Sequence, residues 1–423
     1  MAATRDRAAA GAPPHERLIT VDVLRGFALF GILYAHMIAW YTAGPLPPDL
    51  FQKFQSVPSG LAFGANLLLV MGKFFSVFSF LFGLSFTLQI NSLARRGDNV
   101  ALRFGWRLAV LGLIAAAHHM LWRGDILSIY VPLGFLLIFA RHLGNKALLV
   151  LGAVLVLNLP TRVFEVMALL RTGKVDFVGG DYVMQSTAYF EFVKHSGFVD
   201  MLWGNLQAFG TKIDYQLTSG RLWITFGFFL LGMLVGRLGW FDKAEAALPT
   251  FKAVFKRSWQ AMLVSLVLGL AIVGTAAALS LKVEDRGWPY WFCEYAIDAY
   301  NAACTVFYIS GIALLMAKAR WARRLAPLAD IGKMALTSYL TQTLFGLLIF
   351  YSFGLALFVQ TSPAVNVLIC LAIFAFQIAF SRWWLGRFQH GPIEWLWRSA
   401  TFFKWQPFVK GRPAGALGAG SHS

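Results

Sequence analysis

The sequence predicts an all-α protein, a polytopic transmembrane helical bundle of about ten spans. Hydrophobic residues make up 58% of the 423 residues and charged residues only 13%, and the mean hydropathy is +0.62. Stretches of about 20 apolar residues recur along the chain, which is the length that a helix needs to cross the hydrocarbon core. This composition excludes the two or three soluble domains that a chain of this length would otherwise form.

The remaining features of the composition exclude several other classes. A net charge of +17 is compatible with nucleic-acid binding, but no soluble basic segment carries it, so no nucleic-acid partner is expected. Cys293, Cys304 and Cys370 are scattered, so neither a disulfide framework nor a metal site is expected. The first apolar stretch lacks a convincing small-x-small cleavage site and is expected to stay as an anchor.

The chain divides into five expected segments. These are a disordered arm (1–16), an N-terminal membrane half of about five spans (17–168), an amphipathic periplasmic-side segment (169–218), a C-terminal membrane half of about five spans (219–407) and a disordered tail (408–423). The spans are expected near 21–41, 73–92, 101–121, up to 140, 146–168, 219–240, 258–281, 297–317, from 330 onward and 364–385. Residues 60–72 are expected to form a re-entrant or interfacial helix.

The basic residues indicate the orientation. With the N-terminus inside, 26 of the 37 Lys and Arg residues fall on the inner side and 10 on the outer side, and Lys73 lies in the membrane. Acidic residues divide into eight inside and 12 outside. This bias follows the positive-inside rule, so both termini are expected in the cytoplasm.

The first span carries three ionisable residues, Asp22, Arg25 and His36. At about 100° per residue, all three point to one face of the helix. Ionisable groups in a membrane helix usually face a bundle interior or a wet cavity. The stripe therefore indicates a lined cavity. The structural alternative is an Asp22–Arg25 pair with His36 as a packing residue.

The pattern Asp-x-x-Arg-Gly-x-Ala-x-x-Gly-Ile-Leu, which begins at Asp22, resembles the YeiB-like bacterial inner-membrane proteins (domain of unknown function 418). It is also similar to the start of the transmembrane acyltransferases, in which a functional His follows the Arg by eleven residues, as His36 follows Arg25. The YeiB-like proteins usually have Asn at this position, so His36 favours the acyltransferase form. Further family-like stretches begin at Gly72, Gly124, Gly332 and Gly391.

A second candidate group follows the third span. The Gly-Asp-Ile-Leu turn at Asp125 resembles the family, which often has a His eight residues before the Asp. Here that position is Ala117, and His118 and His119 follow it, so the equivalent His stays open. The structural alternatives are that Asp125 caps the next helix and that the two histidines are interfacial.

Polar residues in two later spans complete the candidates. Lys73 opens the second span and is expected to snorkel to the interface, with a site role as the alternative. Tyr339, Gln342 and Thr343 share one helical face. They are candidates for substrate binding or, alternatively, polar contacts between helices.

The resemblance implies an acyltransferase. Arg25, with Asp22, would hold an anionic donor such as acyl-coenzyme A from the cytoplasm, and His36, Asp125, His118 and His119 would be catalytic. No bound cofactor is expected. The expected partners are membrane lipids and a small-molecule, glycan or lipid acceptor, and the oligomeric state stays open. A transporter or solute-binding protein is the alternative, and an envelope protein without turnover is the third.

The topology generates a testable prediction. Reporter fusions after residue 145 and after residue 250 should both report a cytoplasmic location, because both sites follow an even number of spans. A periplasmic signal at either fusion would contradict the ten-span topology.

Overall fold

The computed structural model describes residues 19–41, 52–95, 97, 99–175, 187–281 and 285–410. In this part of the chain the regular elements are helices, and one isolated antiparallel bridge joins Phe388 to Val409. The elements are α1 (Ile19–Ala35), η1 (His36–Trp40), α3 (Val57–Ala65), η2 (Asn66–Val70), α4 (Phe74–Arg95), α5 (Val100–Leu121), α6 (Leu127–Ala140), α7 (Asn145–Val156), α8 (Leu159–Thr172), α9 (Thr187–His195), α10 (Phe198–Gln207), α11 (Phe209–Thr218), α12 (Arg221–Leu238), α13 (Ala244–Ala278), α14 (Trp288–Met316), α15 (Ala319–Lys333), α16 (Ala335–Phe350), α17 (Pro363–Arg387) and α18 (Pro392–Phe402). The all-α membrane class is confirmed.

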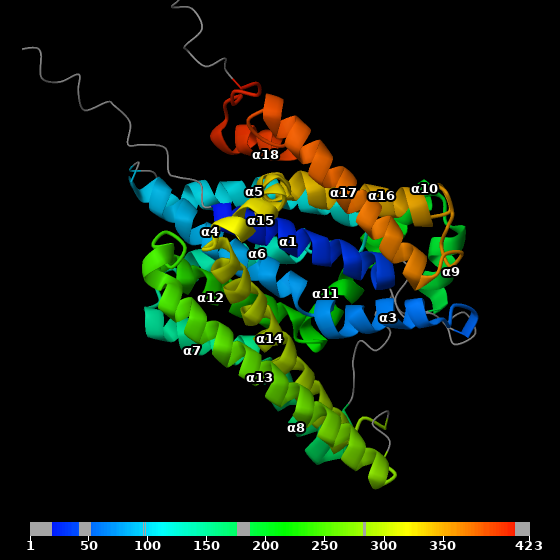
Figure 1. Ribbon diagram of the computed structural model, residues 1–423. Coiled ribbons are helices and arrows are strands. Elements are labelled where there is room, and N and C mark those ends of the chain that lie inside the picture. The colour runs from blue at the N-terminus through cyan, green and yellow to red at the C-terminus, as the bar shows by residue number, and fades with distance from the viewer. Residues whose placement is uncertain are drawn as a thin grey trace, which may run out of the picture.

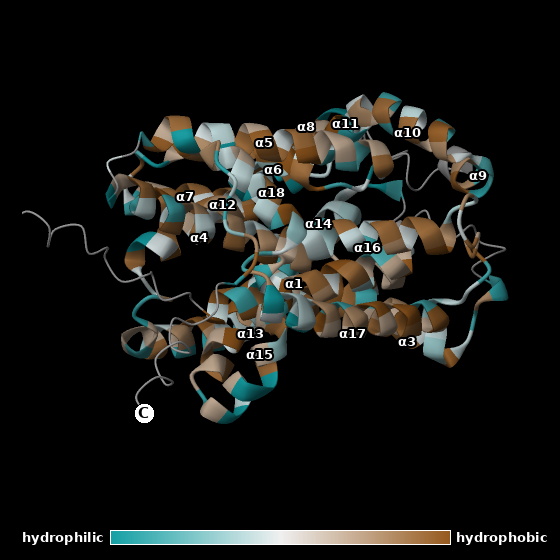
Figure 2. Ribbon diagram, turned by 90° about the horizontal axis from the view of Figure 1, so that it is seen from above, coloured by the Kyte–Doolittle hydropathy of each residue, from teal (hydrophilic) through white to brown (hydrophobic). Residues whose placement is uncertain are grey.

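Seven helices within the described residues are long and apolar enough to cross a membrane. The number rises to eight if α7 and α8, which are bent by 46° relative to each other, form one span. The apolar helices α6 and α16 are shorter. The structure therefore places an apolar helix at each expected span, while the count of ten and the location of the termini stay predictions. Figure 2 shows hydrophobic residues along most of α16 and α17.

Helix α1 lies at the centre of the bundle (Figure 1). It packs against α4 and α15, and also contacts α14, α16 and α17. Its apolar residues belong to two hydrophobic cores, one shared with α5 and α16 and the other with α4 and α12. Because α1 is enclosed in this way, its polar side chains must find partners inside the protein.

Helices α4 and α12 pack closely at Gly83. A methyl group at this position would overlap the backbone of Phe229 on α12, so only glycine permits the observed approach. Small residues at helix contacts allow membrane helices to gain van der Waals packing over a long interface.

The helical conformation is interrupted between η2 and α4, at Gly72. The φ of this residue is +84°, a value that favours glycine. The carbonyl groups that the break exposes accept hydrogen bonds from elsewhere. Lys73 Nζ donates to Leu67 O at 2.8 Å, and Tyr300 and Tyr308 of α14 donate to the next two carbonyls. Lys73 is buried and lies over the Tyr300 ring, so the expected snorkelling is wrong and the residue caps a helix end instead.

The segment expected to be amphipathic, 169–218, contains α9, α10 and α11, while residues 176–186 lie outside the described part. Helix α10 packs on α5 and α11 on α12. Figure 1 shows α9 and α10 at the opposite end of the bundle from α18. The expected arm (1–16) and residues 411–423 of the expected tail lie outside the described residues. Lys410 N donates to Arg387 O, so the start of that tail pairs with the end of α17.

The contact at Gly83 generates a prediction with a matched control. Gly83→Ala should lower the free energy of unfolding by about 1–3 kcal/mol, because the added methyl group forces α4 and α12 apart. Gly105→Ala should be neutral or stabilising, because its nearest neighbour would be a side-chain atom at 3.6 Å. Unfolding of both variants in detergent checks this, and equal effects would contradict the packing described here.

Candidate functional site

A cavity of about 250 Å³ opens beside Arg25 and runs between α1, α4, α5, α6, α15, α16 and α18. We call this side the Arg25 end of the bundle and the other side the His36 end. Most of the lining is apolar and aromatic, with charged groups from Arg25, Arg107, Lys333 and Glu394. Such a cavity suits a ligand with an anionic head and an apolar body.

Arg25 is held by two side chains. Its Nη1 donates to Asp22 Oδ1 and its Nη2 donates to Ser85 Oγ, both at 2.6 Å. Asp22 is 1% exposed, while the Arg25 side chain keeps 24% of its surface. Asp22 therefore fixes the guanidinium from behind and leaves part of it open to the cavity. Of the three residues on the predicted stripe, only Arg25 lines this cavity.

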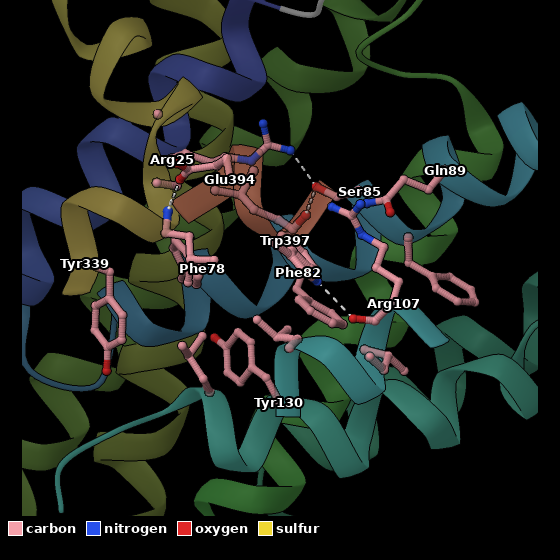
Figure 3. A pocket seen from close by; sticks show the side chains of 18 of the residues that line it. Arg25, Phe78, Phe82, Ser85, Gln89, Arg107, Tyr130, Tyr339, Glu394 and Trp397 are labelled. Atoms are coloured by element: carbon pink, nitrogen blue, oxygen red, sulfur yellow. Dashed lines mark hydrogen bonds between the residues drawn. The ribbon is translucent and has the colours of Figure 1, made fainter. Parts of the chain in front are cut away.

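Arg107 is a second arginine at the cavity, and it was not among the candidates predicted from the sequence. Its guanidinium lies 3.6 Å from the centre of the Trp397 ring, and Trp397 Nε1 donates to Arg107 O at 2.9 Å. Figure 3 shows the Arg25 and Arg107 side chains converging near Ser85. An arginine seven residues into an apolar stretch was the available signal, since charges within spans face protein or water.

Glu394 positions the start of α16 beside the cavity. Its Oε1 accepts hydrogen bonds from Leu336 N and Thr337 N, and its Oε2 accepts one from Thr337 Oγ1. Burial raises the pKa of Glu394, and these hydrogen bonds oppose that effect. The family-like stretch at Gly391 thus supplies a cap for the helix that carries Tyr339, Gln342 and Thr343.

Tyr130 and Tyr339 also line the cavity. Tyr339 OH accepts a hydrogen bond from Ile126 N at 3.2 Å, which fixes the ring across the cavity. The opposite side of this ring meets the His118 imidazole, with 5.0 Å between the ring centres. Tyr339 therefore separates the cavity from the polar cluster at the His36 end.

His118 lies between Asp125 and Thr343. Its Nδ1 is 2.6 Å from Asp125 Oδ1, and its Nε2 is 2.9 Å from Thr343 Oγ1. Because an ionised carboxylate only accepts hydrogen bonds, Nδ1 carries the proton and Nε2 accepts one from the threonine hydroxyl. Asp125 and Thr343 are 1% exposed and His118 is 3% exposed. This is an oriented imidazole facing a hydroxyl, the arrangement of a general base.

Asp125 lies at the centre of this polar cluster and contacts several of its members. Its carboxylate also accepts hydrogen bonds from Leu127 N and Ser128 N, so it caps α6 as the structural alternative expected. Lys212 Nζ lies 3.8 Å from Oδ2 and donates to Asp125 O and to Ser128 Oγ. Burial alone would raise the pKa of Asp125, but Lys212 and His118 hold it well below its usual value.

Lys212 comes from α11, part of a segment that was predicted only to lie over the membrane surface. Burial lowers the pKa of Lys212 to about 8, and Asp125 opposes the shift. Its Nζ is also 3.3 Å from His119 Nδ1, and His119 Nε2 donates to Asn205 O at 2.9 Å. Both histidines therefore have both ring nitrogens engaged, but His118 pairs with a carboxylate and a hydroxyl, whereas His119 pairs with a lysine and a backbone carbonyl. No pattern in the sequence distinguishes Lys212 from other polar residues of its segment.

His36 begins the π-helical segment η1 at the end of α1. Its ring meets Trp122 and Tyr41, with 4.6 and 5.4 Å between ring centres. Its Nδ1 is buried and has no hydrogen-bond partner among the described residues. Tyr41 OH is 3.4 Å from Thr343 Oγ1, so His36 is connected to the His118 cluster through Tyr41.

The structure therefore brings together His118, His119, Asp125, Tyr339 and Thr343, with His36 nearby. Asp22 and Arg25 lie at the other end of α1. Gln342 is separate from both groups, because its Nε2 donates to Gln377 Oε1 and Leu29 O inside the helix packing. Lys73 belongs to the break before α4.

The buried Lys212–Asp125 pair generates a prediction. Lys212→Met and Asp125→Asn should each lower the free energy of unfolding by about 3–5 kcal/mol, because each substitution leaves the other residue as a buried charge without its ion-pair partner. The double variant should lose less than the sum by about 1 kcal/mol or more. Unfolding in detergent checks this, with Lys194→Met on the exposed side of α9 as the control. Strictly additive losses would contradict a direct pairing.

Comparisons with known proteins place the chain in a family. The model of DUF418, a protein family of unknown function, matches residues 235–404. The uncharacterized protein YxaH of Bacillus subtilis (strain 168) is 30% identical over 417 residues, which cover 94% of this chain and 97% of that protein. The uncharacterized protein YeiB of Escherichia coli (strain K12) is 27% identical over 406 residues, covering 91% and 96%. No solved structure matches. The chain therefore belongs to the YeiB-like DUF418 family of proteins.

Proposed function

We propose that the protein transfers an acyl group from an anionic donor, held at the Arg25 end, to an acceptor at the His36 end, within the bacterial inner membrane. The observation that carries the proposal is His118, which bridges Asp125 and Thr343 and whose ring meets Tyr339, a residue that lines the cavity. A base, its orienting carboxylate and a donor cavity thus adjoin one another.

The donor would enter at the Arg25 end. Arg25 and Arg107 present forked donors that match phosphate oxygens, and the apolar lining between them and Tyr339 suits a hydrocarbon chain. Acyl-coenzyme A has both parts. The rise along α1 from Arg25 to His36 is about 16 Å, which an extended donor can span.

His118 would act as the general base. An acceptor hydroxyl that replaces Thr343 Oγ1 at His118 Nε2, after the threonine side chain rotates away, would give its proton to Nε2, and its oxygen would attack the acyl carbon. The carbon–sulfur bond then breaks, and the thiolate takes the proton from Nε2. Asp125 holds the imidazole and stabilises the charge that forms on it. The proposal assigns the base to His118 rather than to His36, because only His118 has an orienting carboxylate.

Transport is the second candidate. The buried Lys212–Asp125 pair favours it, since buried ion pairs in membrane proteins also accompany proton and solute movement. In that case a solute would accumulate across the membrane without covalent change.

The test measures transfer by purified protein in vesicles of bacterial envelope lipid with radiolabelled long-chain acyl-coenzyme A. Labelled lipid should form, and His118→Ala should reduce its rate by about 10²–10⁴-fold. His195→Ala, on the exposed surface of α9, should keep the wild-type rate. Wild-type turnover by folded His118→Ala would overturn the assignment. Label that accumulates inside vesicles without a covalent product would favour transport.

A further inference from the structure

A second hollow lies on the membrane-facing side of the bundle, between α5 and α18. It measures about 490 Å³ and is lined by apolar residues of α5 and by α18 with the residues that follow it. Leu113 is 73% exposed and Leu396 is 47% exposed. Because α5 is apolar enough to cross a membrane, Leu113 faces hydrocarbon rather than water.

One end of the groove is basic. The basic residue in its lining is Lys404. Arg103 and Arg398 lie outside the lining, over the Phe402 ring, 6.0 and 5.4 Å from its centre. The lining that the structure describes contains no acidic side chain. The groove therefore combines a hydrocarbon-facing floor with a cationic end.

The position of Lys404 is set by the end of α18. Phe403 has a φ of +52°, a conformation that few residues other than glycine adopt. Lys404 N donates to Ser399 O, and the Phe403 ring stacks on Trp106 at 5.0 Å. These contacts turn the chain sharply and hold Lys404 at the end of the groove, beside the exposed ring of Trp405.

We propose that this groove binds one anionic phospholipid from the leaflet at the Arg25 end, with its phosphate at Lys404 and a hydrocarbon chain along α5. Basic pockets beside membrane helices suit anionic headgroups, and aromatic side chains such as Trp405 mark the headgroup level. The site is separate from the acyl-donor cavity, although Trp397 forms a wall of both.

The test uses native mass spectrometry of the purified full-length protein. Phosphatidylglycerol and phosphatidylcholine with identical chains are titrated separately, without any acyl donor. The first phosphatidylglycerol should bind about fivefold tighter than phosphatidylcholine, the effect of one interfacial cation. Lys404→Gln should remove that preference, and Lys256→Gln, an exposed residue of α13, should keep it. Ala400→Trp should weaken binding of both lipids by filling the groove.

Four results would overturn the proposal. The first three are equal binding of the two lipids by the wild type, a preserved preference in Lys404→Gln, and loss of the preference in Lys256→Gln as well; the fourth is competition by glycerol phosphate. Glycerol phosphate, which lacks hydrocarbon chains, should not compete with phosphatidylglycerol for the groove. If it does compete, Lys404 binds a soluble phosphate compound rather than a phospholipid. Because no turnover is measured, failure here leaves the proposed acyl transfer untouched, and failure of acyl transfer leaves this site untouched.

Discussion

The charge of Asp125 sets the arrangement at the His36 end of the bundle. A buried carboxylate is stable only if hydrogen bonds and opposite charge replace the water that it has lost. His118, Lys212 and two backbone amides do so, and they come from α5, α11 and α6. The carboxylate therefore ties the surface segment 187–218 to the membrane helices. A similar buried group of charges connects α8 to α14. Arg162 of α8 forms ion pairs with Glu165 of the same helix and with Asp298 of α14.

The two ends of α1 have different chemistry because different neighbours cover them. At one end Arg25 lies beside a cavity with Arg107. At the other end of α1, the π-helical segment η1 directs the His36 side chain toward a cluster of aromatic and polar residues. Tyr339 stands between the cavity and His118, so a ligand that reaches the base must pass or displace that ring. Movement of Tyr339 is thus a requirement of the proposed chemistry, and its hydrogen bond to Ile126 N is the contact that must yield.

The sequence predicted the helical membrane class, the position of each apolar helix and the likeness to the family, because these depend on local hydropathy and short motifs. It also indicated His118 and Asp125, which are seven residues apart at a helix end. It did not indicate Thr343 as the partner of His118, since 225 residues separate them. Lys212 was missed for the same reason. The expectation for Lys73 failed because hydropathy cannot show that Leu67 O and the Tyr300 ring lie within reach.

The central claim is that a donor held beside Arg25 and Arg107 in the cavity reaches the His118–Asp125 pair when Tyr339 moves aside. A structure determined experimentally with a non-hydrolysable long-chain acyl-coenzyme A analogue tests it most directly. The account predicts phosphate density at both arginines, chain density along the apolar lining, and the acyl carbon beside Tyr339 on the side of His118. Analogue bound elsewhere, with an empty cavity and an unmoved Tyr339, would contradict it.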